Sequence, residues 1–221
     1  TLSSELRADF EVAKAAVQVD GKNLQHVSKT LKSDPEIVST ALHSHFGAAE
    51  FVNRDCEILS NKSEIMKILK KNHPGKDQNT SYLYWSKSCW NYADENSVFR
   101  HLDKKLREDK DIVLAALPYN CPVLSWTSKK LKDDREVVLA AIKHSGTRSE
   151  LKHASKRLRD DNLVVKKAME KREDNLEFAS KRIRSDKKMM NKAVLHHSGL
   201  KWVDASLLSN RSLILSAVRF D

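Results

Sequence analysis

The chain has 221 residues, with 40 Lys and Arg against 30 Asp and Glu, and therefore a formal net charge of +10. Its longest uninterrupted apolar run, residues 112–117, is far too short to cross a bilayer, and no signal-peptide pattern is visible. Five Gly, four Pro and the lack of any run that alternates apolar and polar residues exclude a sheet-based fold and favour helices.

A segment of about 25 residues repeats from residue 6 onward. Each copy starts with Leu or Ile, and ten residues later eight of the nine copies carry Ala. The starts are Leu6, Leu31, Leu59, Leu83, Leu106, Leu131, Leu158, Ile183 and Leu207, and the positions ten residues on are Ala16, Ala41, Leu69, Ala93, Ala116, Ala141, Ala168, Ala193 and Ala217. A fixed period of this size is typical of repeat proteins. The recurring Ala indicates a position where neighbouring helices approach too closely for a larger side chain.

The first repeat shows how one copy is built. Asp9 stands three residues after the start, where eight of nine copies carry a residue type that caps helix N-termini. The apolar pair that follows and the Ala share one face of a helix about ten residues long. Gly21, like Gly47 in the next copy, then predicts a left-handed turn at the helix C-terminus. Leu24 and Val27 predict the inward face of a second short helix, which ends at the next start residue.

Residues 72–100 depart from the repeat. A stretch with Pro-Gly, Asp and Asn at residues 73–80 indicates a loop in place of most of the second helix of the third repeat. Six of the chain's 14 aromatic residues follow within 18 residues. Among them, Tyr82, Tyr84 and Trp85 are candidate partner-binding residues, because Trp and Tyr dominate binding hot spots. The alternative is that these rings fill the space left by a missing helix.

The copies from residue 106 onward are the most regular. Residues 106–117 read LREDKDIVLAAL and residues 131–142 read LKDDREVVLAAI. These stretches resemble a repeat family of unknown function with a consensus near LRxDKEVVLAAV. The resemblance covers almost the whole chain, is most specific over residues 106–195, and implies tandem helical repeats but no activity. The third copy departs most, with Lys62 at the capping position and Leu69 at the Ala position.

These patterns predict an all-α fold. A two-helix repeat of this length cannot bury its apolar face alone, so neighbouring repeats must stack on one another. We therefore expect a single α-solenoid over residues 1–221, with an irregular insert near residues 72–100.

A short basic phrase surrounds the start residue of the middle repeats. The candidate anion-binding residues are Lys104, Lys105, Arg107, Lys129, Lys130, Lys132, Lys156, Arg157, Arg159, Lys181, Arg182 and Arg184. Stacking would align them along one edge, where they could face nucleic-acid phosphate, an acidic protein or an anionic membrane. The alternative is that they lie in the last turn of the second helix, where cations complement the helix dipole and nearby Asp residues neutralise them.

The sequence contains no recognisable catalytic or metal site. Cys56, Cys89 and Cys121 are too far apart for a zinc pattern, and phosphate-binding glycine loops, nucleophile elbows and zinc-protease helices are absent from the sequence. We expect no enzyme activity and no metal or small-molecule cofactor. Three sparse cysteines predict a reducing intracellular compartment, namely the cytosol, the nucleus or an organelle interior.

The expected function is that of a non-catalytic protein-interaction scaffold, as an accessory subunit of a larger assembly, because stacked repeats present a long surface. One alternative is an RNA- or DNA-binding solenoid that uses the basic residues as a phosphate track. The other is an enzyme or effector domain with its site in the irregular centre.

Overall fold

The computed structural model describes residues 3–71, 98–119, 123–144, 150–193 and 199–218. Every regular element within these ranges is a helix, so the expected all-α fold is confirmed. The chain forms two compact parts, Thr1–Trp126 and Thr127–Asp221, and each is described by itself. The continuous solenoid over the whole chain stays a prediction.

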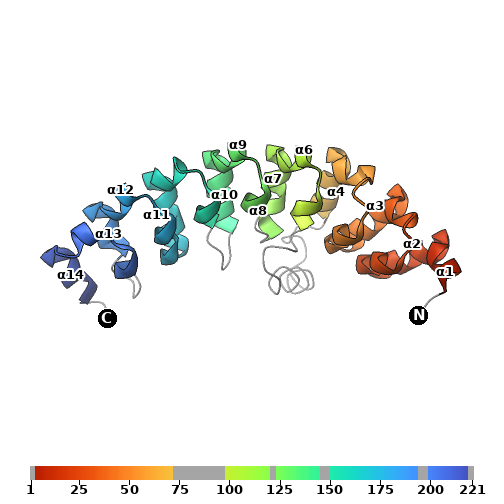
Figure 1. Ribbon diagram of the computed structural model, residues 1–221, viewed down its shortest axis with the longest axis horizontal. Coiled ribbons are helices and arrows are strands. Elements are labelled where there is room, and N and C mark those ends of the chain that lie inside the picture. Colours follow the sequence, from red (N-terminus) through yellow and green to blue (C-terminus); the bar gives the residue numbers. More distant parts are fainter. Residues whose placement is uncertain (1–2, 72–97, 120–122, 145–149, 194–198, 219–221) are drawn as a thin grey trace. The chain divides into compact units, whose positions relative to one another are not determined.

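Each described repeat contributes one main α-helix at the place that its N-cap predicts (Figure 1). These helices are α2 (Phe10–Val19), α3 (Pro35–Ser44), α4 (Lys62–Lys71) and α7 (Lys110–Ala116) in the N-terminal part, and α10 (Arg135–His144), α11 (Asn162–Lys171), α13 (Lys187–Ala193) and α14 (Arg211–Val218) in the C-terminal part. In the N-terminal part, α2 packs on α3, α3 on α4 and α4 on α7. In the C-terminal part, α10 packs on α11 and α13 on α14.

The predicted N-caps form. The Asp34 carboxylate accepts hydrogen bonds from the backbone N–H groups of Glu36 and Ile37, both at 3.0 Å, and the aspartates before α7, α10, α11 and α13 make the same pair of bonds. In the third repeat the cap is Asn61, whose Oδ1 accepts from Glu64 N–H at 3.1 Å. The apparent exception at Lys62 is therefore a shift of the cap by one residue, since the helix begins at Lys62.

The Ala position is buried where repeats have neighbours. The side chains of Ala41, Ala116, Ala141 and Ala168 have exposed fractions of 4% or less. Leu69, which takes the place of Ala in the third repeat, is buried as well.

The predicted left-handed turn at Gly21 and Gly47 is wrong. The backbone of neither residue lies in the left-handed region, and α2 ends on Asp20 in an extended conformation with φ −146°. A Cβ atom on Gly21 would instead collide with the carbonyl oxygen of Ala41 and lie 3.0 Å from the backbone nitrogen of His45. Gly21 is therefore needed because the next repeat approaches its backbone closely.

The second helix, expected as one element that ends at the start residue, is divided into two short elements. The first is η1 (Gly21–His26), η3 (Phe46–Phe51), η6 (Val98–His101), α8 (Val123–Trp126), η8 (Glu150–His153), η10 (Glu173–Phe178) or η11 (Gly199–Trp202), where η marks a 3-10 helix. The second contains the start residue and is α1 (Ser4–Ala8), η2 (Leu31–Ser33), η4 (Glu57–Ser60), α6 (Lys104–Arg107), α9 (Lys129–Lys132), η9 (Leu158–Asp160), α12 (Lys181–Arg184) or η12 (Ala205–Leu207). A further 3-10 turn, η7 (Leu117–Tyr119), follows α7.

An extended residue followed by a new N-cap separates the two short elements. Ala179 (ψ 155°) and Ser180 (ψ 157°) are both extended between η10 and α12. The Ser180 hydroxyl then accepts a hydrogen bond from Ile183 N–H at 3.2 Å, which starts α12 as a separate helix.

The stack order differs from the sequence order in the third repeat. Helix α4 packs directly against α7, and η3 packs against η6. The repeat that begins at Leu106 is therefore the stacking neighbour of the repeat that begins at Leu59. The start at Leu83 lies in residues 72–97, outside the described residues.

A backbone hydrogen bond joins consecutive repeats at the same place. An N–H shortly before a start residue donates to the carbonyl of the preceding start residue or of the residue after it, as in Ser28 to Arg7 and Ser180 to Arg159, both at 2.9 Å. The other bonds of this set run from Asn53 to Lys32, Asp103 to Leu59, Ser155 to Lys132 and Asp204 to Arg184.

Candidate functional site

Two of the predicted anion-binding arginines bind an aspartate of the preceding repeat. Arg157 Nε lies 3.0 Å from Asp133 Oδ1, and its Nη2 donates to the Asp133 carbonyl oxygen at 2.7 Å. The Ser155 hydroxyl donates to the same carboxylate. We call this set of Arg, Ser and Asp an interface clamp, because it joins two repeats.

A second interface clamp lies one repeat further on. Arg182 Nε donates to Asp160 Oδ1 at 2.9 Å, and the Ser180 hydroxyl donates to the same oxygen. The hydrogen bonds from Ser180 and Arg182 lower the pKa of Asp160. As expected, Asp carboxylates neutralise the charges of these two arginines. Each carboxylate belongs to the preceding repeat and not to the basic phrase of the arginine itself.

The basic residues at the first helical position of two main helices make a second kind of bridge between repeats. Lys62 Nζ lies 2.7 Å from Asp109 Oδ2 and 2.8 Å from Asp111 Oδ2. Arg135 Nη2 lies 3.2 Å from Asp161 Oδ1. In both cases the cation contacts the N-cap Asp of the next helix in the stack.

The twelve candidate anion-binding residues therefore fall into three groups. Arg157 and Arg182 belong to interface clamps. Four residues lie directly after a start residue and are half-buried: Arg107, Lys132, Arg159 and Arg184. The Nε atoms of the three arginines among them are buried and have no hydrogen-bond partner. Exposed to solvent are Lys104, Lys105, Lys129, Lys130, Lys156 and Lys181.

The helix whose last turn carries these cations is not the expected second helix but a separate short one. Helix α9 begins at Lys129 after the N-cap Ser128, whose hydroxyl accepts from Leu131 N–H at 3.4 Å. The lysines thus occupy a separate one-turn helix directly after its own N-cap, and the preceding element, α8, ends at Trp126.

The predicted partner-binding residues Tyr82, Tyr84 and Trp85 lie in residues 72–97, outside the described residues. Their role stays a prediction.

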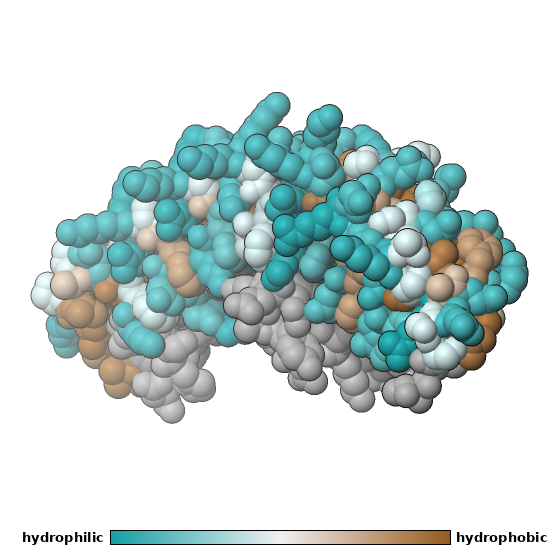
Figure 2. Space-filling view, turned by 45° about the vertical axis from the view of Figure 1, so that its right-hand side comes forward, coloured by the Kyte–Doolittle hydropathy of each residue, from teal (hydrophilic) through white to brown (hydrophobic). Residues whose placement is uncertain are grey.

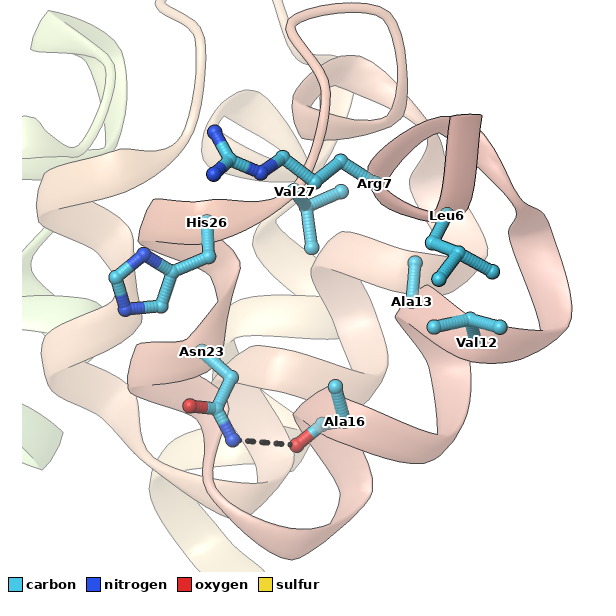
Figure 3. Close-up of a pocket in the computed structure, with 8 residues that line it drawn as sticks. All are labelled: Leu6, Arg7, Val12, Ala13, Ala16, Asn23, His26 and Val27. Carbon is cyan, nitrogen blue, oxygen red and sulfur yellow. Dashed lines mark hydrogen bonds between the residues drawn. The ribbon is translucent and has the colours of Figure 1, made fainter. Parts of the chain in front are cut away.

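An open apolar pocket lies on the first repeat. It has a volume of about 400 Å³ and is lined by Leu6, Arg7, Val12, Ala13, Ala16, Asn23, His26 and Val27. Leu6, Val12 and Ala13 lie on one side, with Asn23 and His26 on the other (Figure 3). Asn23 Nδ2 donates to the Ala16 carbonyl at 2.9 Å, which fixes η1 against α2. Figure 2 shows apolar surface near this end of the N-terminal part, among hydrophilic residues.

The same positions are covered in the second repeat. Ile37 and Ala41, 25 residues after Val12 and Ala16, are fully buried beneath α2 and η1. Val12 and Ala16 are only half-buried, and Leu6 is 44% exposed. The sequence assigned these residues to the core, because nothing in a repeat pattern distinguishes a covered copy from an uncovered one.

A second hollow lies on the C-terminal part between α10 and α11. It has a volume of about 520 Å³ and is lined by Leu139, Ile142, Lys143, Leu163, Lys167, Glu170 and Lys171. Lys167 Nζ contacts Glu170 at 2.7 Å across one turn of α11, and Leu163 is 45% exposed. The hollow is a shallow groove between two helices, with an apolar floor and a charged rim.

In the described residues, no group of three or more His, Cys, Asp or Glu side chains is arranged to hold a metal ion. No helix among them has the length and apolarity to cross a membrane. Cys56 is a buried free thiol whose pKa is raised by burial, which disfavours the reactive thiolate.

Comparison with known proteins leaves the activity open. No curated protein matches the chain, and no solved structure matches it either. The resemblance to an uncharacterised repeat family is confirmed, because residues 9–54 and 109–159 match the model of a domain of unknown function (DUF4116).

Proposed function

We propose that the protein is a non-catalytic scaffold that binds a helical protein partner at the open pocket of its first repeat. The observation that carries the proposal is the contrast between Ala16, which is half-buried, and Ala41, which is fully buried at the same position of the next repeat. A scaffold of this kind would serve as an accessory subunit of a larger assembly.

The neighbouring interface indicates the chemistry of the partner. Ala41 is covered by α2 and η1, and Gly21 brings the backbone of the first repeat against the Ala41 carbonyl. A partner that covers Ala16 as α2 and η1 cover Ala41 would be a helix that ends at a small residue and continues into a short turn. Burial of the apolar floor would supply the driving force, at about 25 cal/mol per Å² of apolar surface.

The test compares three versions of the full chain as baits in native extract, with cross-linking before capture. Ala16→Leu fills the pocket, and Val19→Leu is the matched control, because Val19 lies on the same helix but is 85% exposed outside the pocket. We expect wild type and Val19→Leu to retain the same partner and Ala16→Leu to lose it. Equal capture by all three baits would rule out the pocket as the partner site.

The same assay tests the predicted aromatic site. Tyr84→Ala or Trp85→Ala should weaken capture without unfolding the protein if these side chains bind the partner. Unchanged capture by both variants would restrict binding to the first repeat.

Nucleic-acid binding is the second candidate, and the observation that favours it is the set of six exposed lysines. Its test is a fluorescence-polarisation titration with single-stranded and duplex nucleic acids at two salt concentrations. The substitutions should be Lys130→Glu, Lys156→Glu and Lys181→Glu, because Glu at Arg157 or Arg182 would also break an interface clamp. Binding that neither salt nor these substitutions weaken would exclude a phosphate track.

A further inference from the structure

A small cationic pocket lies in the N-terminal part, where residues that follow η3 face those of η6 and α6. Its volume is about 270 Å³, and it is lined by Val52, Arg54, Leu59, Arg100, His101, Leu102, Asp103, Lys104 and Arg107. Five of these nine residues can carry a positive charge, and one is a carboxylate. Lys104 and Arg107 belong to the basic phrase that the repeat predicts, whereas Arg54, Arg100 and His101 lie outside it.

The carboxylate does not neutralise the pocket. Asp103 Oδ1 accepts a hydrogen bond from Lys105 N–H at 2.7 Å and serves as the N-cap of α6. Within the described ranges, no ion pair joins Arg54, Lys104 or Arg107 to a carboxylate. Arg100 lies over the ring of Trp126, with 5.8 Å from its guanidinium carbon to the ring centroid, which positions the guanidinium without removing its charge.

Three buried apolar side chains lie beneath the charged residues of the pocket. Val52, Leu59 and Leu102 have exposed fractions of 7%, 4% and 2%. Charges above such side chains are less screened by water, so an anion that enters is attracted more strongly than at an open surface. Arg107 adds a buried Nε that lacks a hydrogen-bond partner.

Arg100 and Arg54 both act on His101, which lines the same pocket. Burial lowers its pKa, and so do the charges of Arg100 and Arg54, while Glu50 acts in the opposite direction. Two guanidinium groups from separate repeats therefore act on one small volume.

We propose that this pocket binds a small polyphosphate anion through Arg54, Arg100 and Arg107. Guanidinium groups hydrogen-bond phosphate oxygens in pairs, which favours phosphate over monovalent anions. The pocket matches a short phosphate chain in scale, and of the six exposed lysines only Lys104 lines it. The proposal does not depend on the scaffold function.

The repeat supplies its own control. Arg159 occupies the same repeat position as Arg107 and also has a buried Nε without a partner, so that feature by itself does not make a site. What distinguishes Arg107 is the approach of Arg54 and Arg100. Arg107→Gln and Arg159→Gln remove the same charge from equivalent positions, but only the first lies in the pocket.

The experiment is isothermal titration calorimetry of the full chain with sodium tripolyphosphate at constant ionic strength. We expect one saturable site in wild type. Arg107→Gln and Arg54→Gln should each weaken binding by about tenfold or more, because each removes a charged hydrogen bond. Arg159→Gln should leave the affinity within about twofold of wild type. Arg54 is exposed, so Arg54→Gln tests the site even if Arg107→Gln impairs folding.

Two results would overturn the proposal: no saturable binding to wild type, or equal weakening in all three variants, which would indicate general charge attraction. A parallel titration with ATP distinguishes the sources of the phosphate chain. Equal affinity for ATP and tripolyphosphate assigns recognition to the phosphates alone, and tighter binding of ATP assigns the site to a nucleotide.

Discussion

Ala141 and Ala16 occupy the same position of the repeat in different surroundings. Ala141 lies on α10 with an exposed fraction of 1%, whereas Ala16 lines an open pocket. The sequence predicted a position without room for a larger residue. The burial of Ala141 agrees with that prediction, whereas the third copy buries Leu69 at the same position. The prediction fails for Ala16, because the space around a residue depends on whether a neighbouring repeat packs on it.

We therefore predict opposite outcomes for the same substitution. Ala141→Leu should lower the free energy of unfolding by about 1–3 kcal/mol, because added methyl groups overpack a filled interface. Ala16→Leu should change it by less than about 0.5 kcal/mol, because the side chain can extend into the pocket. Urea denaturation measures both, and a neutral Ala141→Leu would contradict the close packing of the Ala position.

Gly21 and Gly47 differ in what surrounds them. A Cβ on Gly21 meets the backbone of α3, which cannot move alone, whereas a Cβ on Gly47 meets the imidazole of His45 at 2.8 Å. Gly21→Ala should destabilise the protein by about 1–3 kcal/mol. Gly47→Ala should cost clearly less, since the His45 side chain can adjust. Thermal unfolding of the two variants provides the comparison, and equal losses would argue against a backbone collision at Gly21.

At the scale of elements, the main helices were predictable and the short ones were not. A capping Asp and an apolar pair act within one turn, so a single sequence reveals where α3 or α11 begins. The division of the second helix was also readable, since Ser180 is an N-cap residue three positions before Ile183. It was missed because the basic residues after Ser180 suggested the end of a helix instead of the start of one.

The interface clamps lead to a prediction about pH. Because hydrogen bonds lower the pKa of Asp160 in the folded state, its contribution to stability is present above its unfolded pKa of about 3.9 and is lost as the pH falls. Asp160→Asn should therefore lower the thermal midpoint at pH 7 and have little effect at a pH well below 3.8, where the carboxyl is protonated in the folded state as well. Midpoints of wild type and variant at both pH values test this. The same difference at both values would show that the charge of Asp160 contributes nothing.

At the scale of the whole molecule, the stack in the N-terminal part does not follow the sequence spacing. Because α4 packs directly on α7, two helices that residues 72–97 separate in the sequence are neighbours in the stack. The cationic pocket depends on this arrangement, since it unites Arg54 with Arg100 and Arg107. The repeat period could not predict the pocket, because it placed the repeat that starts at Leu83 between the repeats that contain Arg54 and Arg107.

Replacement of residues 72–97 with a ten-residue Gly-Ser linker should preserve the stack. We expect the free energy of unfolding to change by less than about 1 kcal/mol, because the entropy of loop closure varies slowly with loop length. Circular dichroism during urea denaturation measures the change. A much larger loss, or a loss of cooperativity, would show that the replaced residues contribute to packing.

The backbone hydrogen bond between consecutive repeats has a consequence for how such a chain can grow. In each bond of the set, the donor is one N–H close to the next start residue, as in Ser180 to Arg159. In the described ranges, no strand pairing fixes the alignment of neighbouring repeats along the rest of their length. Added residues that leave this hydrogen bond and the main helix in place do not propagate a shift into the next repeat. Where the turn after a main helix makes no close backbone contact of the kind that Gly21 makes with Ala41, it is thus a permissive site. New sequence, and with it new binding specificity, can be inserted there without redesign of the array.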